Sequence, residues 1–109
     1  MEYDLENKKL KLRHLMSRLQ QETDYYNYLI EAKCSYIREA DIKRELLFAV
    51  KINFNEYDRT IEKLDLIEEK LIQSIQNIYS FLYEIETLTL YDIFNNNYIN
   101  NYYQSNIIP

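Results

Sequence analysis

The stretch AVKINFNEYDRTIEKL (Ala49–Leu64) decides whether this chain forms one continuous helix or folds back on itself. Asn53, Asn55 and Asp58 lie close together in it, and the segment NEYD (Asn55–Asp58) has the pattern of a helix start. Asn is a favoured N-cap residue, and an acidic side chain in the first turn is stabilised by the positive end of the helix dipole. We therefore predict a turn near 53–58 that joins helices over about 3–52 and 56–92.

Apolar residues recur on both sides of this stretch with the spacing of helices that pack on other helices. When Leu5 is taken as heptad position a and the count is kept without interruption, most a and d positions up to Ile85 are apolar. Such a pattern, sustained well beyond about four heptads, indicates a coiled coil. A fold-back centred between residues 55 and 56 also places Lys43 opposite Glu68, and pairing offsets much of the cost of burying either charge alone.

We predict an all-α fold, a long antiparallel helical hairpin of the coiled-coil type. A continuous helix is the alternative, because it explains the unbroken heptad count equally well. A third helical segment is also open, since the stretch QETDYYNY (Gln20–Tyr28) contains Thr23 and Asp24, which are candidate N-cap residues for a further break.

The apolar surface is wider than a two-stranded coil needs. Positions e and g of a dimeric coil are usually charged, whereas several are apolar here, so we expect the bundle to be completed by an oligomer or by partner helices. The candidate partner-binding residues at these positions and in the C-terminal tail are Met16, Ile30, Ile37, Leu46, Ile67, Ile72, Tyr79, Phe81, Tyr98, Tyr102 and Tyr103.

The domain organisation that we predict is a helical domain over 1–92 followed by a tail over 93–109. The tail is rich in Asn and Tyr and lacks both helical periodicity and charge after Asp92. It is either frayed or a docking segment whose tyrosines anchor in a groove of a partner.

Composition excludes several classes of fold and site. Gly is absent and the single Pro is Pro109, so the turns of a β-rich fold and the Gly-rich loops that hold phosphate groups are not expected. Hydrophobic residues make up 47% of the 109 residues, which is enough for a core. The charged N-terminus does not resemble a signal peptide, and no apolar run reaches the roughly 18 residues of a membrane span. We expect a soluble intracellular protein, cytoplasmic or nuclear.

Residues for catalysis or metal binding are few. His14 is the single histidine and Cys34 the single cysteine, so a His- or Cys-based metal site lacks ligands and a nucleophilic cysteine lacks a suitable base. We predict no enzymatic activity, no cofactor and no metal.

The net charge of the chain and its distribution bear on which function we expect. The chain has a net charge of −5, and its second half carries most of the acidic excess, although Lys8–Arg18 contains five basic residues and no acidic one. Our first hypothesis is a structural or interaction subunit of a protein assembly that acts through helix packing. The alternative is a small acidic inhibitor, of phage or virus type, of a nucleic-acid-binding enzyme. Direct nucleic-acid binding through Lys8–Arg18 is the weakest hypothesis, because the protein as a whole is acidic.

Overall fold

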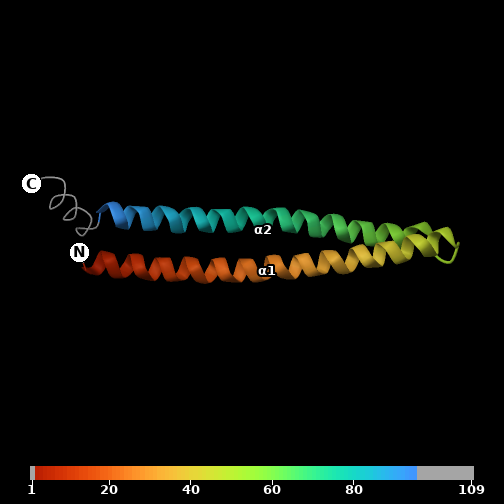
Figure 1. The fold of residues 1–109 in the computed structure, drawn as a ribbon, viewed down its shortest axis with the longest axis horizontal. Helices are drawn as coiled ribbons and strands as arrows, with labels where there is room; N and C mark the ends of the chain where they lie inside the picture. Colours follow the sequence, from red (N-terminus) through yellow and green to blue (C-terminus); the bar gives the residue numbers. More distant parts are fainter. Residues whose placement is uncertain (1, 96–109) are drawn as a thin grey trace, which may run out of the picture. The chain divides into compact units, whose positions relative to one another are not determined.

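The computed structural model consists of two long helices joined by a short turn (Figure 1). It describes the backbone of residues 2–95 and the side chains of residues 4–90. Helix α1 covers Glu2–Phe48, helix α2 covers Phe54–Asn95, and no strand is present in the described part of the chain. The predicted all-α helical hairpin is confirmed, and the continuous helix is excluded. Helix α1 also runs without a break through 20–28, so no third helical segment begins there.

The turn lies earlier than the sequence indicated. Helix α1 ends at Phe48, and residues 49–53 form the turn, whereas residues 54–58 of the predicted turn belong to the first turns of α2. The amide of Val50 donates to the carbonyl oxygen of Leu47 at 3.0 Å, and the amide of Lys51 donates to that of Leu46 at 2.9 Å. This pair of bonds is a Schellman motif, which normally has Gly at its left-handed position. Here that position is Val50, with φ of 58°.

Helix α2 begins with an Asn cap, although at Asn53 and not at Asn55. The Asn53 side-chain oxygen Oδ1 accepts a hydrogen bond of 3.1 Å from the amide of Glu56. That amide is one of the donors that a helix N-terminus leaves without an intrahelical partner. Glu56 itself lies in the first turn, where its charge complements the helix dipole. Asn53 and Asn55 are two residues apart and equally good cap formers, so local sequence does not choose between them.

The described residues fall into two compact units, each of which contains a segment of α1 packed antiparallel against a segment of α2. The turn unit comprises residues 21–78. The terminal unit comprises the described residues 2–20 and 79–95. Neither helix has a stretch, in the described part of the chain, that is long and apolar enough to cross a bilayer.

The core of the turn unit is a narrow seam between α1 and α2. Leu29, Ile67 and Leu71 form its buried cluster, and Tyr26 and Tyr36 pack against it. Ala40 and the polar residues Thr60 and Ser74 are also buried. In α1 the less exposed residues follow the predicted a and d positions. In α2 they follow d and g, so Ile67 and Ser74 at g are buried while Glu68 and Ile75 at a are exposed.

The predicted facing of Lys43 and Glu68 is therefore wrong. Lys43 contacts Thr60 through its ammonium group, at 2.9 Å from Oγ1, and Glu68 pairs with Lys33 at 3.6 Å. The cause is the displaced turn, because a loop need not contain a whole number of heptads. A heptad count that is continued across the loop then predicts the wrong residues of α2 for the seam.

Candidate interaction surface

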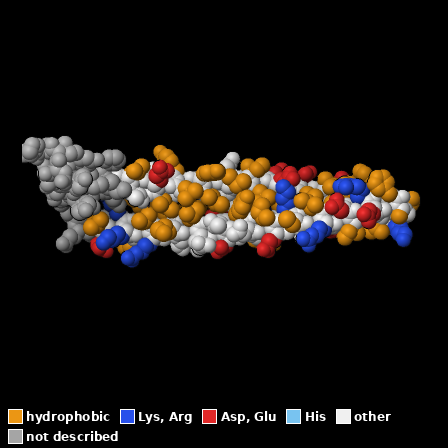
Figure 2. Space-filling model, viewed as in Figure 1, with side chains coloured by type: hydrophobic (Ala, Val, Ile, Leu, Met, Phe, Trp, Pro, Cys, Tyr) orange, Lys and Arg blue, Asp and Glu red, His pale blue; other side chains and the backbone are white. Residues whose placement is uncertain are grey.

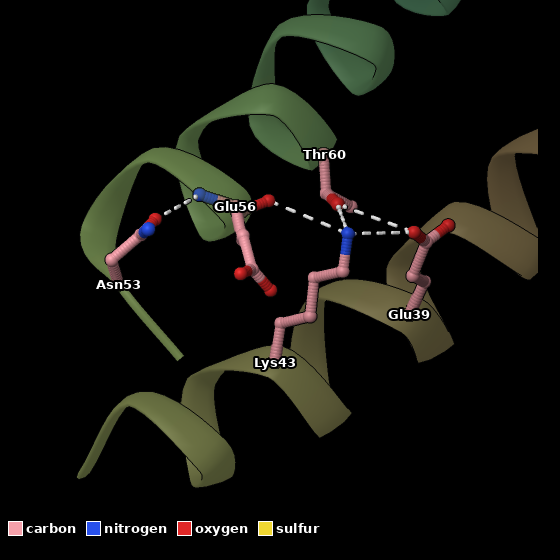
Figure 3. A network of polar contacts seen from close by, with 5 residues as sticks. All are labelled: Glu39, Lys43, Asn53, Glu56 and Thr60. Carbon is pink, nitrogen blue, oxygen red and sulfur yellow. Dashed lines mark hydrogen bonds and ion pairs between the residues drawn. The ribbon is translucent and has the colours of Figure 1, made fainter. Parts of the chain in front are cut away.

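A small polar network joins the two helices next to the turn (Figure 3). The Lys43 ammonium group lies 2.9 Å from a carboxylate oxygen of Glu39 and donates to the Thr60 hydroxyl and, at 3.4 Å, to the Glu56 carbonyl oxygen. The Thr60 hydroxyl in turn donates to Glu39 at 3.4 Å. Thr60 is fully buried, and this arrangement satisfies its hydroxyl as both donor and acceptor. The network links α1 to α2 next to the turn.

Electrostatics in the network favour the charged form of Glu39. The hydrogen bond from Lys43 lowers the pKa of Glu39 from its ordinary value of 4.5, and the charges of Lys43 and Lys63 act in the same direction. Burial opposes this shift but does not overcome it. Glu39 is therefore a carboxylate held for ion pairing, which is the opposite of the raised pKa that a general acid needs.

The tip of the hairpin exposes three large apolar side chains. Phe48, Val50 and Phe54 are 81%, 88% and 62% exposed. The Phe54 ring makes a tilted contact with Tyr57, with ring centroids 6.3 Å apart, and still faces solvent over most of its surface. The tip therefore exposes apolar groups over most of their surface.

A longer apolar surface lies along one side of the turn unit, and we call it the isoleucine face. It is formed by Ile30 and Ile37 of α1 and Ile72 and Ile75 of α2, which are 37% to 58% exposed. Three of them line an open groove of about 340 Å³ between the helices, together with Tyr26, Leu71 and the ion pair of Lys33 and Glu68. Figure 2 shows how widely hydrophobic side chains of both helices reach the surface between charged ones.

The opposite side of the seam carries a second groove, which we call the tyrosine face. Its volume is about 240 Å³, and its exposed apolar members are Tyr25, Tyr28 and Leu66. The Tyr25 and Tyr28 rings stack with centroids 6.5 Å apart, while Lys63 lies 5.6 Å from the centroid of Tyr36. These ring contacts cover part of this face from within the chain.

The terminal unit has its own surface features. Leu15 is buried there, and the Arg18 guanidinium lies 4.8 Å from the centroid of the Phe81 ring. An open groove of about 350 Å³ is lined by Lys11, Tyr83, Glu84, Thr87 and Leu88. Within the predicted basic stretch, Lys9 pairs with Glu6 at 3.6 Å. Arg18 and Lys9 thus contact other groups of the chain.

The predicted partner-binding residues divide according to heptad position. Those at e are exposed: Met16, Ile30, Ile37, Ile72 and Tyr79. Those at g lie in or beside the contact between α1 and α2, where Ile67 is buried and Leu46 and Phe81 are half-buried. Tyr98, Tyr102 and Tyr103 lie outside the described residues. Ile75 falls at position a of the heptad count, which predicts that it lies in the seam, but it is a surface residue because the turn is displaced.

The described residues contain no cluster of three or more His, Cys, Asp or Glu side chains that could hold a metal ion. Cys34 and His14 are both exposed and lie on different units of the chain. Comparison of the chain with protein-family models, with curated proteins and with solved structures finds no match.

Proposed function

We propose that this chain is a non-enzymatic interaction subunit of a protein assembly and that partner helices pack on its isoleucine face. The observation that supports the proposal is the exposure of Ile30, Ile37, Ile72 and Ile75 in two parallel rows beside the seam. Rows of apolar side chains at heptad spacing are what a further helix packs into.

Burial of these four side chains would contribute appreciably to association. Complete burial of an isoleucine is worth about 1.5–3 kcal/mol, and each of the four is already partly covered, so together they contribute roughly 3–5 kcal/mol. Association itself costs about 4–15 kcal/mol in lost freedom of motion. The four isoleucines therefore form the apolar centre of the proposed interface, and flanking residues have to supply the rest.

Site-specific crosslinking in the native cell tests this proposal. A photoreactive amino acid at Ile72 of the full chain should form covalent adducts, whether the neighbour is a second copy or another protein. The same probe at Glu69, which is exposed and three residues away on α2, should form few. If the probe at Ile72 gives no adduct while the protein is folded, the proposal is wrong.

The acidic inhibitor is the second candidate function. Glu62, Asp65 and Glu69 are all exposed on α2 and form an acidic row. Binding through such a row would weaken steeply as salt is raised from about 0.05 to 0.5 M, whereas apolar packing would change little. Once a partner is in hand, the salt dependence of its dissociation constant separates the two functions.

A further inference from the structure

The groove in the isoleucine face is lined by one positive and one negative side chain, and their placement indicates what covers the face. Lys33 of α1 and Glu68 of α2 lie across the groove from each other, 3.6 Å apart and 35% and 55% exposed. Their charges cancel, so a copy of the same face meets no net repulsion there. Both side chains also keep exposed surface with which to contact a second molecule.

We infer that the isoleucine face binds the same face of a second copy, in a parallel two-fold arrangement with both turns at the same end, and this inference rests on the proposed function. A two-fold axis that runs along the helices between two such faces lays α1 of one copy over α2 of the other. Lys33 of each copy then meets the partner's Glu68 in the same layer. The result is a four-helix bundle with a closed ring of alternating charges beside four rows of isoleucines.

A crossed two-fold arrangement centred on the groove does not fit the charges. If the two-fold axis crosses the helices at the level of the groove, α1 lies over α1 and α2 over α2. Lys33 then meets Lys33 of the partner subunit, and Glu68 meets Glu68 of the partner subunit. Like charges brought together in an apolar interface disfavour that arrangement.

The isoleucine face forms the centre of the dimer contact and not the whole of it. Ile30 and Ile37 lie about 10 Å apart along α1, at roughly 1.5 Å per residue. An interface of standard size takes about 800 Å² from each partner, so exposed residues farther along α1 and α2 have to supply the rest of the contact.

The first test measures molecular mass by sedimentation equilibrium of the full chain at micromolar concentration. We expect a dimer, and we expect Ile72→Glu to raise its dissociation constant at least a hundredfold while the helical circular dichroism persists. The matched control is Leu66→Glu, since Leu66 is exposed to a similar extent, 51% against 58%, but lies on the tyrosine face. This control should remain dimeric. A folded monomer, or equal loss in both variants, overturns the inference.

The second test examines the charge ring. Lys33→Glu alone gathers four carboxylates in one layer and should weaken the dimer about tenfold or more. Glu68→Lys alone should weaken it similarly, whereas the double exchange Lys33→Glu/Glu68→Lys should restore it. A mixture of the two single variants should form a heterodimer in preference to either homodimer. If the single variants dimerise as strongly as the unmodified chain, the charge ring does not exist.

The third test determines the direction of packing. Spin labels at Lys51→Cys, in a Cys34→Ser background, report the distance between the two turns. The parallel arrangement places them within about 30 Å, whereas the crossed one separates them by about 50 Å or more, from roughly 1.5 Å per residue along both arms. The longer distance overturns the inference. Crosslinking of Ile72 to a different protein by a chain that is monomeric also overturns it, while leaving the proposed function in place.

Discussion

Val50 occupies the position at the end of α1 where a Gly is usual. Its left-handed backbone conformation completes the Schellman motif at the end of α1, and a β-branched side chain is poorly suited to that conformation. A chain without Gly lacks the residue that enters this conformation at no steric cost. The turn therefore carries backbone strain at a position where the side chain is 88% exposed and gains little from packing.

We expect Val50→Gly to stabilise the protein by about 1 kcal/mol. The left-handed conformation costs roughly 1–2 kcal/mol in a residue with a Cβ atom, and Gly avoids this cost. The greater conformational freedom of Gly in the unfolded chain offsets part of the stabilisation. The midpoint of urea unfolding measures the effect. Val50→Ala retains a Cβ atom and should give a much smaller gain, so equal gains from Gly and Ala would refute the assignment of strain to Val50.

Ser74 is a second residue with an identifiable cost. It is 1% exposed in the seam, and its hydroxyl has no hydrogen-bond partner within the described structure. A buried hydroxyl without a partner is destabilising, so Ser74→Ala should raise the free energy of unfolding by about 1 kcal/mol. Exposed Ser35 on α1 is the control, because Ser35→Ala gains only helix propensity, at most about 0.5 kcal/mol. Equal gains at both sites would mean that the Ser74 hydroxyl is satisfied.

At the scale of elements, α1 and α2 are joined near the turn by the network of Glu39, Lys43 and Thr60. Since the pKa of Glu39 is lower in the folded chain than its ordinary value, this carboxylate stabilises the hairpin at pH values above about 4.5. The contribution disappears as the pH falls through the folded pKa, when Glu39 becomes protonated. Its size is below about 1 kcal/mol, because the carboxylate is partly solvated.

Glu39→Gln provides the test of that contribution. The variant should be less stable than the unmodified chain at pH 7, and the difference between the two should shrink towards zero as the pH falls through the folded pKa of Glu39, because both side chains are then neutral. Chemical unfolding at several pH values measures this difference. Glu31→Gln serves as the control, because Glu31 is exposed on α1 and has no contact with the network. A difference that is independent of pH would assign the effect to packing.

At the scale of the whole molecule, the position of the turn determines which residues of α2 are buried in the seam of the turn unit. Ile67 is 7% exposed in the seam and Ile75 is 38% exposed on the isoleucine face. Ile67→Ala should therefore cost about 2–4 kcal/mol, whereas Ile75→Ala should cost about 1 kcal/mol or less. Both are measured by urea unfolding at a concentration where the chain is monomeric. The register predicted from the heptad count gives the reverse order, so this pair decides between the two.

The sequence alone determined that the chain is helical and where the seam of α1 lies, and it favoured a hairpin over a continuous helix. These properties depend on local preferences and on heptad spacing, which act within one helix: no Gly or interior Pro interrupts it, and Leu15, Leu29 and Ala40 recur on one side. The exposed apolar positions Ile30, Ile37 and Ile72 were recognisable for the same reason.

Only the tertiary structure decided which residues of α2 face α1. Asn53 and Asn55 are both suitable caps for α2. The left-handed position after α1 is Val50 and not Gly, so the sequence does not indicate where α1 ends. The choice of turn depends on how the two helices fit against each other over their packed length, which no local segment encodes. A displacement of a few residues in the turn moved Ile67 into the seam and Ile75 onto the surface, because each heptad row faces a different direction.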